Sequence, residues 1–210
     1  MSTFTVESTK KSPPLQALPK AVGIQQLHHY AYRAKDAEET RHFYEDILGL
    51  PLYHIIQSDH VPSTGEYCPY THFFFRLLDG SFIAFFDLGD DEAALPSPNT
   101  PVWVNHIAFR VDTVEELEHA KARLQAHGIE VLGITDHHVF QSIYFFDPNG
   151  IRLELTVQTG SKETMHQESL DAHERLRLWT QRKEAWRAEK AATGVEVKLK
   201  PERNDRPEFF

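Results

Sequence analysis

The chain has 210 residues, a formal net charge of −9 and 40% hydrophobic residues. This acidic balance argues against a nucleic-acid partner, because nucleic acids select a basic protein face. The single cysteine, Cys68, excludes an internal disulfide and a thiolate metal cluster. No apolar stretch near the start has the length of a signal peptide or a membrane helix, so we expect a cytoplasmic protein without a membrane partner.

Composition divides the chain into five segments. These are a polar N-terminal arm (1–22), a first folded module (23–94), a proline-rich linker (95–101), a second folded module (102–158) and a charged C-terminal extension (159–210). Helix-forming residues from Lys162 to Ala192 predict a helix in the extension, and a polar tail follows it.

The two modules are related by an internal repeat. LHHYAYRAKDAEET at 27–40 aligns with VNHIAFRVDTVEEL at 104–117, so that His29 falls on His106. In each copy a short polar residue precedes a glutamate by three positions, the spacing of a capping box. These boxes predict helices over 37–48 and 114–127, ended by Gly49 and Gly128.

Apolar runs of strand length follow each predicted helix. They lie at 52–57, 71–78 and 81–88 in the first module, and at 130–135, 141–146 and 151–157 in the second. Each module therefore has the order strand, helix, strand, strand, strand. We predict an α+β fold of paired βαβββ modules that form a curved mixed sheet around a cleft, with a C-terminal helical extension.

Three side chains of these strands have the chemistry of metal ligands. Alternation places His29 and His106 at equivalent positions on the first strand of each module, and it places Glu154 opposite the apolar face of the last strand. Two imidazoles and one carboxylate can hold one face of an iron(II) ion and leave other positions open. The first-module counterpart of Glu154 is Ala84, which favours this triad over a site with four protein ligands.

The paired modules resemble the vicinal-oxygen-chelate superfamily, which includes glyoxalase I, bleomycin- and fosfomycin-resistance proteins and extradiol dioxygenases. The stretch TDHHVFQSIYFFDPNGIRLE at 135–154 further resembles the extradiol ring-cleavage signature. The elements of that signature are His137, the pair Ile143-Tyr144, the turn Asp147-Pro148-Asn149-Gly150 and the ligand Glu154.

The resemblance implies a non-heme iron(II) dioxygenase, with manganese(II) as a possible replacement, that cleaves a catechol or hydroquinone-like ring with O2. It implies that His29, His106 and Glu154 bind the metal, that His137 transfers protons and that Tyr144 hydrogen-bonds the substrate. The usual further histidine of the first module is replaced by Ser81. His72 is the nearest substitute, and His54 and His60 are further candidates.

Two other functions remain open. A glyoxalase- or epimerase-like lyase or isomerase would use the metal on an enediolate, and it would normally need a second carboxylate. A sequestering protein would trap a planar compound against the aromatic side chains of the first module. Arg152, on the face of Glu154, is suited equally to an anionic substrate group and to a carboxylate of the protein. A homodimer is the expected assembly.

Overall fold

The computed structural model describes residues 23–94 and 100–194; the predicted arm, most of the linker and the predicted tail lie outside these residues. The first module contains β1 (His29–Ala34), α1 (Ala37–Arg41), the π-helix η2 (His42–Ile47), β2 (Leu52–His60), β3 (Tyr67–Arg76) and β4 (Phe82–Asp87). The second contains β5 (Ile107–Arg110), α2 (Val114–Ala126), β6 (Leu132–Asp136), β7 (Phe140–Phe146) and β8 (Arg152–Gln158), and α3 (Lys162–Thr193) follows it. The α+β class and the order of elements in each module are confirmed.

Each module forms its own four-stranded mixed sheet. The strand orders are β1-β4-β3-β2 and β5-β8-β7-β6, with the first strand of each module parallel to the last. The registers are equivalent, because Ala31 pairs with Ala84 in the first sheet as Ala108 pairs with Glu154 in the second. The sequence repeat is therefore a structural repeat, and Ala84 is the counterpart of Glu154.

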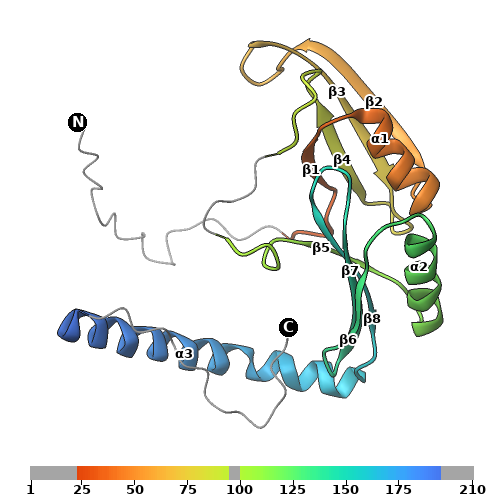
Figure 1. Cartoon of the computed structure of the whole chain (residues 1–210). Coiled ribbons are helices and arrows are strands. Elements are labelled where there is room, and N and C mark those ends of the chain that lie inside the picture. The colour runs from red at the N-terminus through yellow and green to blue at the C-terminus, as the bar shows by residue number, and fades with distance from the viewer. Residues whose placement is uncertain (1–22, 95–99, 195–210) are drawn as a thin grey trace, which may run out of the picture.

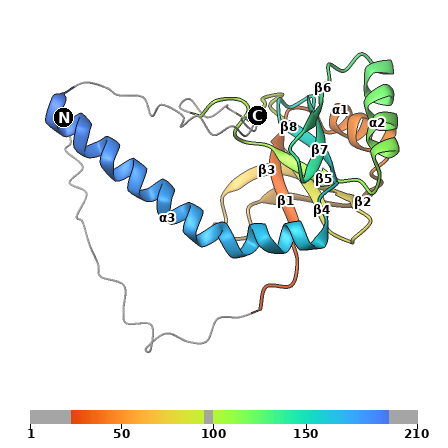
Figure 2. The ribbon, with the colours of Figure 1, turned by 90° about the horizontal axis from the view of Figure 1, so that it is seen from below.

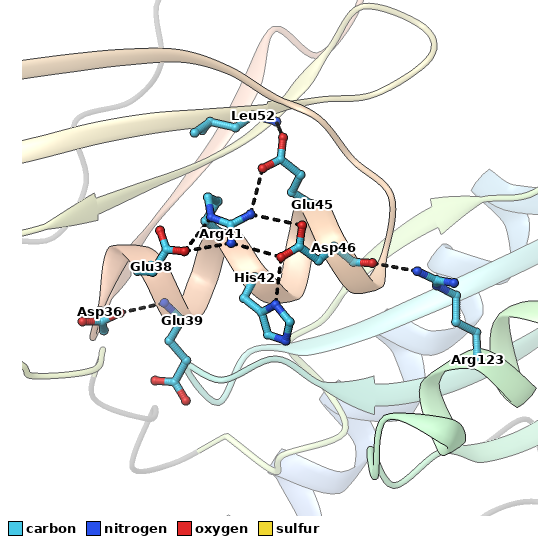
Figure 3. A network of polar contacts seen from close by, with 9 residues as sticks. All are labelled: Asp36, Glu38, Glu39, Arg41, His42, Glu45, Asp46, Leu52 and Arg123. Atoms are coloured by element: carbon cyan, nitrogen blue, oxygen red, sulfur yellow. Dashed lines mark hydrogen bonds and ion pairs between the residues drawn. The ribbon is translucent and has the colours of Figure 1, made fainter.

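The two capping boxes differ in the structure. Thr113 and Glu116 form the complete reciprocal box at the start of α2. At α1, Asp36 accepts a hydrogen bond from the Glu39 backbone N–H at 2.7 Å, but the Glu39 carboxylate points away from Asp36 (Figure 3). The predicted helix over 37–48 continues from α1 as a π-helix. Both helices end near glycines with a positive φ, at Gly49 and Gly128, as expected from the sequence.

A charge cluster surrounds Arg41 on the first helical segment. Its guanidinium group contacts the carboxylates of Glu38, Glu45 and Asp46, while His42 contacts Asp46 at 2.8 Å (Figure 3). The hydrogen bonds from Arg41 and then His42 lower the pKa of Asp46 to about 2. These contacts stabilise the charged carboxylate at the surface of the helix.

The modules join through their helices and one turn, as α1 and α2 at the right of Figure 1 indicate. Tyr44 donates a hydrogen bond to Asp147 at 3.1 Å, and the Lys35 N–H donates to the Asn149 side chain at 2.8 Å. One buried apolar cluster contains residues of both modules, among them Phe43, Phe85 and Leu153. Side chains alternate between the two faces of each strand, and only one face of each sheet contributes to this cluster. The opposite faces, which carry His29 and Glu154, therefore lie outside it.

The C-terminal helix α3 extends away from both sheets (Figures 1 and 2). Ser161 caps its start by accepting from the Thr164 N–H, and Gly194 ends it in the left-handed conformation. No residue of α3 is buried. Of the helices in the described part of the chain, none has the length and apolar composition needed to cross a membrane.

Candidate metal centre and its cavity

The second sheet carries a buried carboxylate on its outer face, which is the face directed away from the shared core. In β8, Leu153 and Leu155 point into the shared core, and alternation directs Glu154 to the other face. Only 4% of Glu154 is exposed to solvent. A buried carboxylate needs partners that offset its lost hydration.

Three residues of the described part of the chain contact the Glu154 carboxylate. Ser142 donates to Oε1 at 2.5 Å and the Tyr144 hydroxyl donates to the same oxygen at 3.3 Å, both from the neighbouring strand β7. The other oxygen, Oε2, lies 3.0 Å from Nε2 of His106. The Nδ1 atom of His106 lies 3.0 Å from the Val104 carbonyl oxygen. In the tautomer with the proton on Nδ1, this proton is donated to the carbonyl and the Nε2 lone pair is available to a metal, as in many metal-binding histidines.

His137 and Tyr144 extend this cluster. Nε2 of the buried His137 lies 2.8 Å from the Tyr144 hydroxyl, which links the imidazole through the phenol to Glu154. Burial, and then the charge of Glu154, raises the pKa of the Tyr144 hydroxyl. The phenol therefore remains protonated near neutral pH and acts as a donor to the carboxylate.

Arg152 is oriented by two contacts. Its guanidinium group lies over the Tyr144 ring, 4.2 Å from the centroid, and Nη1 donates to the Trp103 carbonyl at 2.5 Å. The cation supports the position of the ring through a cation–π interaction. Arg152 therefore packs against the Tyr144 ring.

A cavity of about 360 Å³ lies against this cluster. It is lined by His106, Ala108, Arg110, Val139, Phe140, Glu154, Thr156, Gln158 and Met165. Met165 belongs to the first turns of α3, so the C-terminal extension contributes to the wall. The cavity places a histidine and a carboxylate beside apolar side chains, as small-molecule sites commonly do.

The first sheet carries histidines and aromatic rings on its outer face. The ring of His29 lies 6.1 Å from His72 and 5.6 Å from Phe74, and its Nδ1 lies 2.7 Å from Nδ1 of His28. His72 is buried, bonds the Phe85 carbonyl at 2.9 Å and stacks on Phe86. Burial, and then the neighbouring histidines, lowers the pKa of His72. The neutral imidazole is therefore favoured there.

The remaining first-module candidates have local contacts. Ser81 donates to Asp79 at 2.6 Å in the turn before β4. His54 lies against Phe74, and the ring of His60 contacts Tyr67. Each of these three residues thus has a partner within its own module.

The structure gathers four of the six predicted site residues. His106, Glu154, Tyr144 and His137 form one cluster, whereas His29 and His72 lie together on the first sheet. Within residues 23–94 and 100–194, no three His, Cys, Asp or Glu side chains are placed to hold a metal ion. The donor set of His106 and Glu154 fits two positions of a divalent metal, and a third protein ligand would have to come from elsewhere.

Sequence reasoning did not single out Ser142. Its side chain is fully buried and forms the shortest contact to Glu154 of the partners described above. It precedes Tyr144 by two residues on β7 and pairs with Thr156, so strand alternation places it on the face of the site. That alternation is the signal by which the sequence could have revealed it.

The two modules match a known protein family. Residues 26–155, more than half of the chain, match the model of the Glyoxalase/Bleomycin resistance protein/Dioxygenase superfamily. The chain belongs to this superfamily, the vicinal-oxygen-chelate family expected from the sequence.

Individual relatives include both named and uncharacterised proteins. The chain is 36% identical over 98 residues to the "Putative ring-cleaving dioxygenase MhqA" of Bacillus subtilis, a match that covers 47% of this chain but 29% of that longer protein. It is 27% identical over 140 residues to "Uncharacterized protein YaeR" of Escherichia coli, across 65% of this chain and 99% of that one. A Frankia glyoxalase/bleomycin resistance protein/dioxygenase domain shares the fold, with a TM-score of 0.53, 16% identity and coverage of 65% of this chain and 99% of that domain.

Proposed function

We propose that this protein is a non-heme iron(II) dioxygenase of the extradiol type, which cleaves a catechol or hydroquinone-like ring with O2. The observation that carries the proposal is the chain of contacts from His137 through Tyr144 to Glu154, with His106 beside it at a cavity. The match to the Bacillus protein, whose name describes ring cleavage, supports the same reaction class.

His106 and Glu154 would hold the metal, and their partners suit that role. Val104 orients the His106 ring, and Ser142 with Tyr144 fixes one carboxylate oxygen while leaving the other toward His106. Iron(II) or manganese(II) held by His106 and Glu154 would supply the Lewis-acid and redox chemistry that a reaction of a dihydroxylated ring with O2 requires.

Side chains of the protein would carry out the proton transfers. In this proposal, the imidazole of His137 takes a proton from a substrate hydroxyl and later returns it, because a neutral imidazole has one nitrogen that can accept a proton. The Tyr144 hydroxyl, which already bonds His137, donates to a substrate oxygen beside Glu154. Arg152 over the phenol ring limits the positions that this hydroxyl can take.

The third metal ligand would be His29 of a second copy. Within one chain the modules join through helices and the 147–150 turn, so the faces with His29 and Glu154 lie outside their shared core. The sequence repeat and the equivalent registers relate these two faces by approximate symmetry. A homodimer that apposes the first sheet of one copy and the second sheet of the other would complete the triad, with His72 near the substrate.

Oxygen uptake tests the reaction. Anaerobically purified protein given ferrous iron and a panel of catechols and hydroquinones should consume O2 and form ring-opened products. Tyr144→Phe should lower kcat, while Tyr32→Phe, on the face of β1 opposite His29, serves as a matched tyrosine control. Absence of oxygen uptake with every ring of the panel would contradict the dioxygenase proposal. Isomerase activity under argon with nickel or cobalt would instead indicate the enediolate chemistry.

Complementation tests the shared site. His29→Ala and Glu154→Ala should each abolish activity alone. Refolding an equal mixture of the two variants should restore about a quarter of the wild-type sites, since half of random dimers are mixed and each mixed dimer has one intact triad. Two active single variants, or a mixture without restored activity, would contradict a triad formed between copies.

A further inference from the structure

The extension α3 lies outside the part of the chain that matches the family, and it carries a stripe of apolar residues that no described residue buries completely. The match ends at residue 155, whereas α3 begins at Lys162. At 32 residues and 1.5 Å per residue, α3 is about 48 Å long. Because most helical stability in proteins comes from packing of an apolar face, a helix of this length with no buried residue lacks its main source of stability.

The apolar stripe follows one side of α3. Met165, Ala172, Trp179 and Trp186 recur at intervals of seven residues, and Leu176 lies on the same side, four residues after Ala172. Leu176 is 62% exposed and Trp179 is 46% exposed. A row of two tryptophans, a leucine and a methionine on one side of a protruding helix is typical of a contact with another helix.

The charges of α3 are divided between its halves. Residues 162–174 contain one lysine and four acidic residues, whereas residues 175–193 contain six basic and two acidic residues. Some of these charges pair along the helix, as Arg175 does with Glu168. An antiparallel partner of the same sequence would place each acidic half beside a basic half, while a parallel partner would place like charges together.

The sizes of the apolar residues are also self-complementary about the middle of the helix. A two-fold axis near Leu176 would bring the small Ala172 level with Trp179 of the second copy, and Met165 level with Trp186. A large ring opposite a small residue allows two helices to approach closely. The same register would bring Glu168 level with Lys183 of the other copy.

We propose that α3 pairs in an antiparallel manner with α3 of a second copy, around a two-fold axis close to Leu176. The contact is isologous, as in a closed symmetric dimer. Met165, which also lines the cavity beside Glu154, lies at the far end of this stripe. The proposal is independent of the reaction, because it is based on α3 alone.

Cysteine cross-linking in the full-length chain tests the contact. With Cys68 replaced by Ser, Leu176→Cys should form disulfide-linked dimers under mild oxidation, because the axis brings the two thiols together. Leu178→Cys is the matched control, since residue 178 lies on the opposite side of the same helix turn and is also exposed. Equal cross-linking of the two variants, or none from Leu176→Cys, would overturn the proposal.

A second pair of variants determines whether the two α3 helices run antiparallel or parallel. Met165→Cys mixed with Trp186→Cys should give a cross-linked heterodimer, whereas Met165→Cys alone should not. Cross-linking of Met165→Cys with itself would indicate parallel helices and contradict the proposal. These measurements use metal-free protein, so their outcome does not depend on the proposed reaction. Cross-linking here, together with no oxygen uptake by the iron-loaded protein, would retain the α3 contact and reject only that reaction.

Discussion

Ser142→Ala is the substitution that tests how the candidate metal centre is organised. The Ser142 hydroxyl is fully buried and donates to the Glu154 carboxylate at 2.5 Å. Alanine keeps the strand and removes this donor, together with the contact of the same hydroxyl to Thr156 Oγ1 at 3.0 Å. The Glu154 oxygen then retains the Tyr144 hydroxyl at 3.3 Å as its described side-chain donor. The carboxylate should lose its fixed orientation toward His106.

The expected loss of metal affinity follows from the type of hydrogen bond that is removed. A hydrogen bond to a charged group contributes about 1.5–3 kcal/mol. Since about 1.4 kcal/mol corresponds to a tenfold change in affinity, its loss should weaken metal binding by about 10- to 100-fold. The stability of the metal-free protein should fall by about 1–3 kcal/mol, because Glu154 remains buried with fewer donors.

Calorimetric titration of the apoprotein with manganese(II) measures the affinity, and urea unfolding measures the stability. Ser58→Ala is the matched control, because the Ser58 hydroxyl donates to the His60 carbonyl on β2, away from Glu154. A folded Ser142→Ala variant with a metal affinity within about twofold of wild type would refute this view of the centre.

Three further substitutions test the fold. Tyr44→Phe removes the buried donor to Asp147 and should lower the free energy of unfolding, measured in urea, by about 1–2 kcal/mol. Tyr32→Phe is the control and should lower it by less than about 0.5 kcal/mol, because the Tyr32 hydroxyl bonds Tyr30 near the surface. An equal effect of the two substitutions would contradict the role of the buried hydrogen bond. Because the pKa of Asp46 is lowered from 3.8 to about 2, the contribution of this carboxylate to stability is present above pH 3.8 and is lost as the pH falls through 2. Asp46→Asn should therefore flatten the pH dependence of the urea midpoint between about pH 4 and 2. An unchanged slope would contradict the stabilising role of the Arg41 cluster. Gly133→Ala should destabilise more than Gly150→Ala, because both glycines have a positive φ but only at Gly133 would a Cβ lie 2.6 Å from the Ser142 carbonyl oxygen; similar thermal midpoints would contradict this packing.

Local periodicity was sufficient to predict the elements and their faces. Alternation in β8 placed Leu153 and Leu155 in the core and Glu154 on the other face, and the structure agrees. The repeat predicted the correspondence of Ala84 and Glu154, and the equivalent strand registers confirm it. These features depend on neighbours along the strand, which the sequence contains directly.

The relation between the modules could not be predicted in the same way. It depends on contacts between distant residues, such as Tyr44 with Asp147 and Lys35 with Asn149. A periodic pattern marks a face as apolar or polar but does not state which partner covers it. For the same reason the sequence placed His29 and Glu154 around one cleft without distinguishing a cleft within one chain from one between two copies.

The metal content of purified protein tests the central claim most directly. Protein loaded with iron(II) under argon and then desalted should retain about one metal per chain. Glu154→Ala and His29→Ala should each lose most of it, whereas Glu118→Ala and His119→Ala, which replace exposed residues of α2, should retain it. Full metal content in Glu154→Ala would contradict the account.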